Sequence, residues 1–389
     1  MTTSSHRPSS PTATEPSTSD TNATTITEDN AGTSLRHRWA VDVSAWAPSD
    51  EEFDWARSTL ILDEEVAQVN KYRFPEDRKR ALVSLVLQRT AGVTYARWRR
   101  MNSRTSSKEV VELDPLVDVE LGKTKGRKPY IVKAASDEDP ENTDNFNFNV
   151  SHDGKFVVLA SELYCVCGCD VSWAGAVMGK SRKPSEGGPD ESLDGLRRTL
   201  KSFQNQLTIT EWEKVWEKGL AEGVEEVEAV SEDGHLGGGK GKTRGVAREF
   251  SKYWSLKEAY AKAIGMGLGY DLGRLEFEIL ESGRAEDVMS VAFVSIDGEL
   301  SERWCCYVQR LRDDHWVSVA RGPVDDVVDA LGGFLGGFGV KDMGKDLVNT
   351  TVFQDLEPVF EELTFGDVVR MGYGTVVYET WAARFGGGR

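Results

Sequence analysis

The 389-residue chain has 39% hydrophobic and 9% aromatic residues, enough for one large or two medium cores, which excludes a wholly disordered protein. Its formal net charge of −17 argues against a general basic surface that wraps nucleic acid, although a local basic patch could still bind phosphates. We find no run of roughly 18 apolar residues that could span a bilayer and no apolar secretory signal, so we expect no membrane contact and a cytoplasmic location.

Residues 1–34 have the composition of a disordered tail. About half of them are Ser or Thr, and they carry Glu15, Asp20, Glu28 and Asp29 with little basic charge. Such a segment cannot bury enough apolar surface to offset the entropy lost on ordering. A transit peptide is the weaker interpretation, because transit peptides are normally poor in acids.

Strand and helix patterns follow along the chain. "RWAVDVSAW" (38–46) is typical of a strand, and "DRKRALVSLVLQRTA" (77–91) has apolar residues at helical spacing. "NFNFNV" (145–150) alternates apolar residues with asparagines, and "KFVVLAS" (155–161), after the turn residues "SHDG", predicts the second strand of a hairpin.

Three cysteines alternate in "YCVCGCD" (164–170), which places Cys165, Cys167 and Cys169 on one face of a strand. A metal cluster is conceivable, but zinc sites usually have two separated pairs with CxxC-like spacing. We therefore predict buried, reduced cysteines, and the same for Cys305 and Cys306.

The rest of the chain alternates flexible composition with regular patterns. Segments near 179–195 and 222–245 are typical of inserted flexible loops. They are followed by a predicted helix in "FSKYWSLKEAYAKAIGMG" (250–267) and by predicted strands in "RLEFEIL" (274–280), "VMSVAFVSI" (288–296) and "HWVSVAR" (315–321). The sum predicts an α+β protein whose halves each have a long helix and several strands.

The 250–267 helix carries Trp254, Glu258 and Lys262 four residues apart on one face, with Lys257 beside them. This spacing brings side chains within reach of one another, so a surface ion pair between Glu258 and Lys262 is the simplest interpretation.

A second interpretation involves Asp170, which ends the strand "VCGCDV" on the face opposite the cysteines. Gly168, two residues earlier, leaves room beside the carboxylate. One carboxylate at a strand end and another on a helix can hold Mg²⁺ together with phosphate oxygens and water. Asp170 and Glu258 are such a pair if the fold brings them together.

Positive charge and donors for phosphate occur in two places. The loop "GKTKGRKPY" (122–130) contains Lys123, Lys125, Arg127 and Lys128. "NVSH" (149–152) places Ser151 and His152 in a hairpin turn, where hydroxyl, imidazole and backbone N–H groups can converge on an anion. Neither is specific alone, because a basic loop is most often a solvated surface and a lone turn histidine is usually structural.

In this order, "KTKGRKP", "FNFNVSHDGKFVVLA", "GCDV" and "FSKYWSLKEAYAKAIGMGLG" resemble the larger, two-halved 4′-phosphopantetheinyl transferases. The resemblance is to the eukaryotic type associated with aminoadipate-semialdehyde dehydrogenase, and it spans roughly Trp39 to Arg321. It implies two similar α+β halves related by pseudo-twofold symmetry, with coenzyme A in the cleft between them.

The resemblance also implies an activity. The enzyme would use Mg²⁺ to move the phosphopantetheine arm of coenzyme A onto a serine of a carrier protein, releasing adenosine 3′,5′-bisphosphate. Its partners would be acyl and peptidyl carrier domains of fatty-acid, polyketide and nonribosomal peptide synthesis, with aminoadipate reductase of lysine biosynthesis a candidate. We expect a monomer. A noncatalytic coenzyme A- or carrier-binding paralogue is the alternative, and a magnesium phosphohydrolase is a more distant one.

Site roles implied by the resemblance fall on matching positions. Asp170 and Glu258 would bind Mg²⁺, Glu258 would activate the carrier serine, and Lys262 would stabilise the transferring phosphate. Coenzyme A contacts are expected from the basic loop, the "NVSH" turn and the helix: Lys123, Lys125, Arg127, Lys128, Asn149, Val150, Ser151, His152 and Lys257. Trp254 is as well explained by packing.

Two departures from the family pattern leave questions open. Ser172 stands where many members have a second acid, so a third metal position would fall to water or its hydroxyl. The loop reads "GRKP" instead of "GKP", so either Arg127 or Lys128 could make the phosphate contact.

We expect an N-terminal half at 35–153, a C-terminal half at 154–321 that includes the two loops, and a C-terminal extension at 322–389. The extension contains "GGFLGGFGV" and is expected to be partly ordered at best. We expect it to cover the apolar back of the second half.

Overall fold

The computed structural model describes residues 35–102, 112–134, 145–163, 165–178, 192–230, 238–280, 289–336, 338 and 357–386. The predicted tail 1–34 and residues 179–191 of the first predicted loop lie outside them. Helices and sheets alternate along the chain, which confirms the α+β prediction. Among the described helices, none is both long enough and apolar enough to cross a membrane.

The first half is a sheet covered by helices. Its elements are β1 (Arg38–Asp42), α1 (Asp50–Thr59), α2 (Asp63–Asn70), α3 (Pro75–Asn102), β2 (Val119–Lys123), β3 (Pro129–Ala134), β4 (Asn147–Asp153) and β5 (Phe156–Glu162). The sheet has the order β12-β1-β5-β4, in which β12 (Glu361–Leu363) comes from the C-terminal extension, and β2 and β3 form a separate antiparallel pair. The predicted hairpin is confirmed, since β4 and β5 pair antiparallel from Asn147 opposite Glu162 to Asp153 opposite Phe156.

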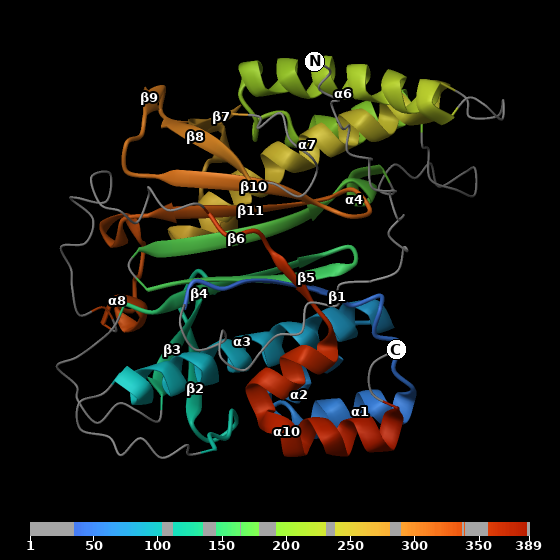
Figure 1. Ribbon diagram of the computed structural model, residues 1–389. Coiled ribbons are helices and arrows are strands. Elements are labelled where there is room, and N and C mark those ends of the chain that lie inside the picture. The colour runs from blue at the N-terminus through green and yellow to red at the C-terminus, as the bar shows by residue number, and fades with distance from the viewer. Residues whose placement is uncertain are drawn as a thin grey trace, which may run out of the picture.

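The second half has the same plan, with a long helix against its sheet. Its elements are β6 (Val166–Trp173), α4 (Ala174–Met178), α5 (Leu193–Leu200), η1 (Lys201–Phe203), α6 (Ile209–Val230), α7 (Gly238–Ala263), η3 (Gly267–Gly269), η4 (Leu272–Arg274), β7 (Leu275–Leu280), β8 (Ser290–Ile296), β9 (Glu299–Leu300), β10 (Cys305–Leu311) and β11 (His315–Gly322). The order is β6-β11-β10-β8-β7, with β9 paired to β8. Edge strands β6 and β4 lie side by side, so the two sheets meet there (Figure 1).

The division between the halves falls later than expected. β5 pairs with both β1 and β4, so the first sheet extends to Glu162, beyond the predicted boundary at 153. The predicted turn is also shorter: "NVSH" lies inside β4, and the chain reverses at Gly154 and Lys155.

The predicted loop at 222–245 is largely helical. α6 continues to Val230 and α7 begins at Gly238. Glycines allow the two helices to approach closely: a Cβ on Gly219 would lie 2.5 Å from the Cα of Val246, and one on Gly245 would lie 2.1 Å from the carbonyl oxygen of Gly219. Gly245, one of the glycines that suggested a loop, is therefore a packing residue.

The C-terminal extension packs on both halves: Val324, Val327, Phe334 and Phe338 join the buried cluster of the second half, and its last elements pack on the first half. It contains η5 (Val324–Asp326), α8 (Gly333–Gly336), β12 (Glu361–Leu363) and α10 (Phe365–Phe385). β12 pairs parallel with β1, and α10 packs against α3. A Cβ on Gly372 of α10 would lie 2.3 Å from the hydroxyl of Thr90, so a small residue is needed at this contact.

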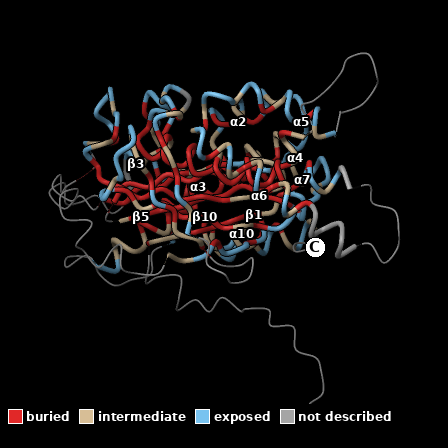
Figure 2. Tube along the Cα trace, turned by 90° about the horizontal axis from the view of Figure 1, so that it is seen from above, coloured by how far each residue is buried: buried red, intermediate tan, exposed pale blue. Residues whose placement is uncertain are grey.

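The apolar core joins the two halves. One buried cluster lies between the first sheet and its helices and another between the second sheet and its helices. A third takes Phe156 and Val158 from β5 together with Cys169 and Val171 from β6 and Val319 from β11. Buried residues accordingly run continuously through the middle of the molecule (Figure 2).

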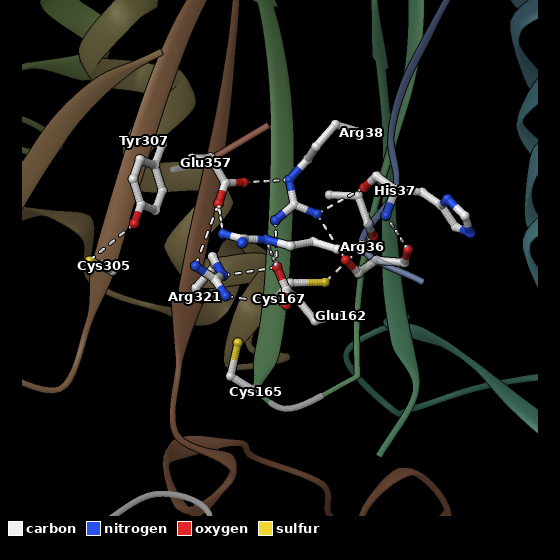
Figure 3. Close-up of polar contacts among 12 residues, drawn as sticks. Arg36, His37, Arg38, Glu162, Cys165, Cys167, Cys305, Tyr307, Arg321 and Glu357 are labelled. Atoms are coloured by element: carbon white, nitrogen blue, oxygen red, sulfur yellow. Dashed lines mark hydrogen bonds and ion pairs between the residues drawn. The ribbon is translucent and has the colours of Figure 1, made fainter. Parts of the chain in front are cut away.

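Five charged side chains form a buried cluster where the extension crosses both sheets (Figure 3). Glu162 lies 2.5 Å from Arg38 and 2.8 Å from Arg321, measured between nitrogen and oxygen. Glu357 of the extension lies 2.5 Å from Arg38 and also pairs with Arg36 and Arg321. Glu357 therefore links β1 of the first half to β11 of the second.

Replacing Glu357 with Gln should destabilise the protein strongly. Three arginines would then share one buried carboxylate, and breaking a buried ion pair from one side costs about 3–5 kcal/mol. Urea unfolding would measure the loss. Glu362→Gln is the matched control, because its pair with Arg312 is half exposed and worth no more than about 1 kcal/mol. Equal effects of the two substitutions would contradict the linking role of Glu357.

His37, stacked on Trp39 at a ring-centroid distance of 4.2 Å, should make stability depend on pH. Burial, and next the Arg38 charge, lower the pKa of His37 from 6.5 to about 3. Between these values the unfolded chain binds a proton that the folded chain does not, so the free energy of unfolding should fall as pH falls. The slope is at most about 1.4 kcal/mol per pH unit.

His37→Phe keeps the stacked ring and should remove this contribution. Urea unfolding of wild type and variant at pH 7.5, 6 and 5 tests it. The stability of wild type relative to the variant should fall as the pH falls, and a constant difference across this range would refute the assignment.

Candidate active site

Helix α7 rests directly on β6 at Gly168. A Cβ there would lie 2.1 Å from the carbonyl oxygen of Ala259 and 2.3 Å from the backbone nitrogen of Ala263. The room predicted beside Asp170 is thus filled by the helix backbone. This contact brings the turn that carries Glu258 and Lys262 against Asp170.

Strand β4 is held to β6 by side chains rather than by a backbone ladder. The amide oxygen of Asn147 accepts from the backbone N–H of Cys167 at 3.0 Å, and that of Asn149 accepts from the N–H of Cys169 at 3.0 Å. Two residues further on, the hydroxyl of Ser151 donates to Asp170 at 2.8 Å. We call this row of contacts the β4–β6 junction.

At the end of the junction Lys262 completes a buried polar group. Its Nζ lies 2.6 Å from Oδ1 of Asp170 and 2.7 Å from Oγ of Ser151. Burial alone would lower the pKa of Lys262, but the Asp170 carboxylate outweighs burial and raises it. Lys262 therefore carries its charge here at neutral pH.

Glu258 faces the same group without a hydrogen-bond partner for its buried Oε1. Burial, and next the Asp170 carboxylate, raise the pKa of Glu258 to about 7. Two neighbouring carboxylates, one with an unsatisfied oxygen, fit a divalent cation. No group of three or more His, Cys, Asp or Glu in the described residues could hold a metal, so phosphate oxygens and water would supply the other ligands.

A cavity of about 530 Å³ opens beside these residues, between the two halves. Its lining includes most of the predicted site residues: Lys123, Lys125, Arg127, Lys128, Asn149, Val150, His152, Glu258 and Lys262. Asp170 and Ser151 lie next to it, hydrogen-bonded to Lys262. The abundance of cations makes the cavity suited to a polyanion.

His152 on the cavity wall is neutral at physiological pH. Its side chain stays exposed in the cavity, and partial desolvation of the ring, and next the charges of Lys262 and Arg80, lower its pKa. A neutral imidazole can donate one N–H to an anion without adding charge.

Other lining residues were not predicted. Gln68, Lys71 and Tyr72 come from α2 and the turn after it, and Ser84 and Gln88 from α3. Ser84 and Gln88 are polar residues one turn apart in an otherwise apolar helical stretch. That spacing was a usable signal for a polar face inside the core.

Two residues of the helix motif lie away from the cavity. Lys257 is fully buried, pairs with Glu211 at 2.7 Å and donates to the carbonyl oxygens of Leu272 and Leu275. The expected contact between Lys257 and coenzyme A is therefore corrected to a structural role. Trp254 packs on Phe203 and Phe250.

Comparison with known proteins gives two family matches. Residues 44–164 match the model described as 4′-phosphopantetheinyl transferase, N-terminal, and residues 209–320 match that of the 4′-phosphopantetheinyl transferase superfamily.

Curated relatives agree with these matches. The chain is 31% identical over 287 residues to a phosphopantetheinyl transferase of Thraustochytrium sp., covering 72% of this chain and 77% of the relative. It is 27% identical to the human L-aminoadipate-semialdehyde dehydrogenase-phosphopantetheinyl transferase, covering 73% and 74%. A 57-residue stretch, covering 15% of this chain and 18% of the relative, is 44% identical to 4′-phosphopantetheinyl transferase pptA of Paxillus involutus.

Gly168→Ala should displace α7 and with it Glu258 and Lys262. Backbone atoms cannot give way as a flexible side chain can, so we expect at least about a hundredfold loss of activity and a cost of about 1–3 kcal/mol in stability. The turnover rate measures the loss of activity, and thermal unfolding measures the loss of stability. Gly336→Ala is the control, since its Cβ would meet nothing within 4 Å. A fully active Gly168→Ala protein would contradict this account of the site.

Proposed function

The chain belongs to the 4′-phosphopantetheinyl transferase superfamily, and we propose that it transfers the 4′-phosphopantetheine arm of coenzyme A to a serine of apo carrier domains. In this reaction the serine oxygen bonds to the phosphorus that carries the pantetheine arm. The bond from that phosphorus to the bridging oxygen breaks, and adenosine 3′,5′-bisphosphate leaves.

The observation that carries the proposal is the convergence of Asp170, Ser151, Lys262 and Glu258 beside one cationic cavity. Phosphoryl transfer needs little covalent chemistry from a protein. It needs groups that position the reactants and neutralise charge on the phosphate oxygens.

Each residue has a role that its contacts support. Lys262 supplies a fixed positive charge for the phosphate, and Ser151 holds Asp170 in place through its hydroxyl. His152 offers a neutral N–H from the cavity wall. Glu258 is the group placed to accept the proton of the attacking serine, directly or through a water molecule.

Asp170 and Glu258 would hold Mg²⁺. When bound, Mg²⁺ would polarise the pyrophosphate and neutralise part of its charge. Ser172, which stands where many family members have a second acid, is buried on β6 two residues after Asp170.

The alternative is a noncatalytic paralogue that binds coenzyme A or carriers. The presence of Asp170, Glu258 and Lys262 together favours catalysis, since binding alone gives no need for the acid on the helix. Acyl and peptidyl carrier domains are the proposed partners. Aminoadipate reductase is a further proposed partner, because several relatives are named for L-aminoadipate-semialdehyde dehydrogenase. The monomeric state and the cytoplasmic location stay predictions.

The decisive test incubates the protein with coenzyme A, Mg²⁺ and an apo carrier domain and weighs the carrier by mass spectrometry. A gain of one phosphopantetheine is expected. Glu258→Gln and Asp170→Asn should each lower the rate by about 10²–10⁴. Glu278→Gln, at an exposed position of β7, is the control.

Retained activity in either site variant would refute the role given to that residue. A carrier of unchanged mass, with coenzyme A still bound by the wild-type protein, would favour the noncatalytic alternative.

A further inference from the structure

The basic loop presents two adjacent cations, Arg127 and Lys128, in different environments. Lys128 is 3% exposed, and its Nζ donates to the carbonyl oxygen of Cys167 at 2.5 Å. The same nitrogen lies 5.3 Å from the ring centroid of Phe334 in α8. The charged end of Lys128 is thus held by β6 and by the C-terminal extension.

Arg127 has the opposite character. It is exposed on the cavity wall, and within the described residues its guanidinium has no hydrogen bond or ion pair. Its φ of 69° lies in the left-handed region, which is unfavourable for a residue with a Cβ. The conformation alone does not mark a functional residue, because Asp297, Asp313 and Asp314 also have a positive φ.

The turn around Arg127 is fixed at several points. The N–H of Arg127 donates to the carbonyl oxygen of Thr124 at 2.8 Å, and the N–H of Lys128 donates to the hydroxyl of Thr124 at 3.0 Å. A Cβ on Gly126 would lie 1.7 Å from the carbonyl oxygen of Gly265, just after α7. The loop therefore touches the second half at Gly126 and again at Lys128.

We propose that Arg127 is the residue of this pair that binds a phosphate of coenzyme A, and that Lys128 is a positioning residue anchoring the loop to β6. The inference rests on the proposed function and answers the question left by "GRKP". Lys128 also lines the cavity, but its Nζ is held by the carbonyl oxygen of Cys167 and lies over Phe334, so a shift of this nitrogen toward a phosphate would strain both contacts. Arg127 would lose no such contact on binding a phosphate, and its planar guanidinium suits bidentate contact with phosphate oxygens.

The anchor also connects the loop to the reaction centre. Cys167, which accepts from Lys128, lies three residues before Asp170 on β6 and is itself held by Asn147. The extension closes the other side, since the N–H of Val328 donates to the carbonyl oxygen of Ile264 at the end of α7. Loss of the anchor should therefore loosen the loop without removing a phosphate contact.

Titration of the full-length protein with coenzyme A and with dephospho-coenzyme A, at several salt concentrations, tests this. Arg127→Asn removes the charge with a residue that tolerates the left-handed region. It should raise Kd for coenzyme A about tenfold and flatten the salt dependence. A loss confined to coenzyme A assigns Arg127 to the 3′-phosphate, and a loss for both ligands assigns it to the pyrophosphate; either supports the proposal.

Lys128→Met should leave the slope of log Kd against log salt at the wild-type value while lowering the melting temperature. Phe334→Leu removes the ring above Lys128 without changing the charge. It should also keep the wild-type slope and lower the melting temperature, so it replaces Lys128→Met in the test if that variant does not fold. The proposal is overturned if Lys128→Met flattens the slope, if Phe334→Leu alters it, or if Arg127→Asn binds as wild type does. Wild-type protein that binds no coenzyme A would overturn the proposed function as well.

Discussion

The β4–β6 junction is the interaction on which the rest of the molecule depends. Two edge strands normally pair through their backbones or leave N–H and C=O groups exposed. Here asparagine side chains replace the ladder: Asn147 also donates to the carbonyl oxygen of Cys165 at 2.8 Å, in addition to accepting from Cys167. Because a side-chain amide offers both a donor and an acceptor, it can satisfy a peptide group at a spacing that a backbone ladder would not allow. The junction therefore sets the distance between the halves, and the cavity lies along it.

Helix α7 shows how one sequence motif serves two purposes. Lys257 and Glu258 are neighbours in sequence but point to different surroundings, because successive helical residues are about 100° apart. Lys257 anchors the helix to Glu211 and to the chain before β7, whereas Glu258 faces Asp170. Replacing Lys257 would leave Glu211 buried without its partner, which is costly. Substitution should therefore be tolerated at Lys257 no better than at Glu258.

The sequence predicted those features that depend on local periodicity. Alternation in "NFNFNV" and "KFVVLAS" predicted β4 and β5, and alternating cysteines predicted a strand that buries its thiols. It could not predict contacts that depend on a distant partner. The glycines near 240 suggested a loop because nothing local indicates that α6 packs against them. The resemblance implied a ligand contact for Lys257, and no pattern within the helix argued against it, because its partner Glu211 lies 46 positions earlier. Asp170 and Glu258 were proposed as a pair from the chemistry of two carboxylates, and only the resemblance gave a reason to expect the fold to bring them together.

The parallel pairing of β12 with β1 has a consequence for biosynthesis. Trp39 lies opposite Glu361, so the first strand to leave the ribosome obtains one of its neighbours only after more than three hundred further residues have been made. Until then one border of that sheet stays open, and α3 lacks the cover that α10 provides. Contacts so distant in sequence slow folding, and an uncovered strand border invites association with other chains. During synthesis the nascent protein would thus pass through a long interval in which this strand and this helix face are exposed to other chains.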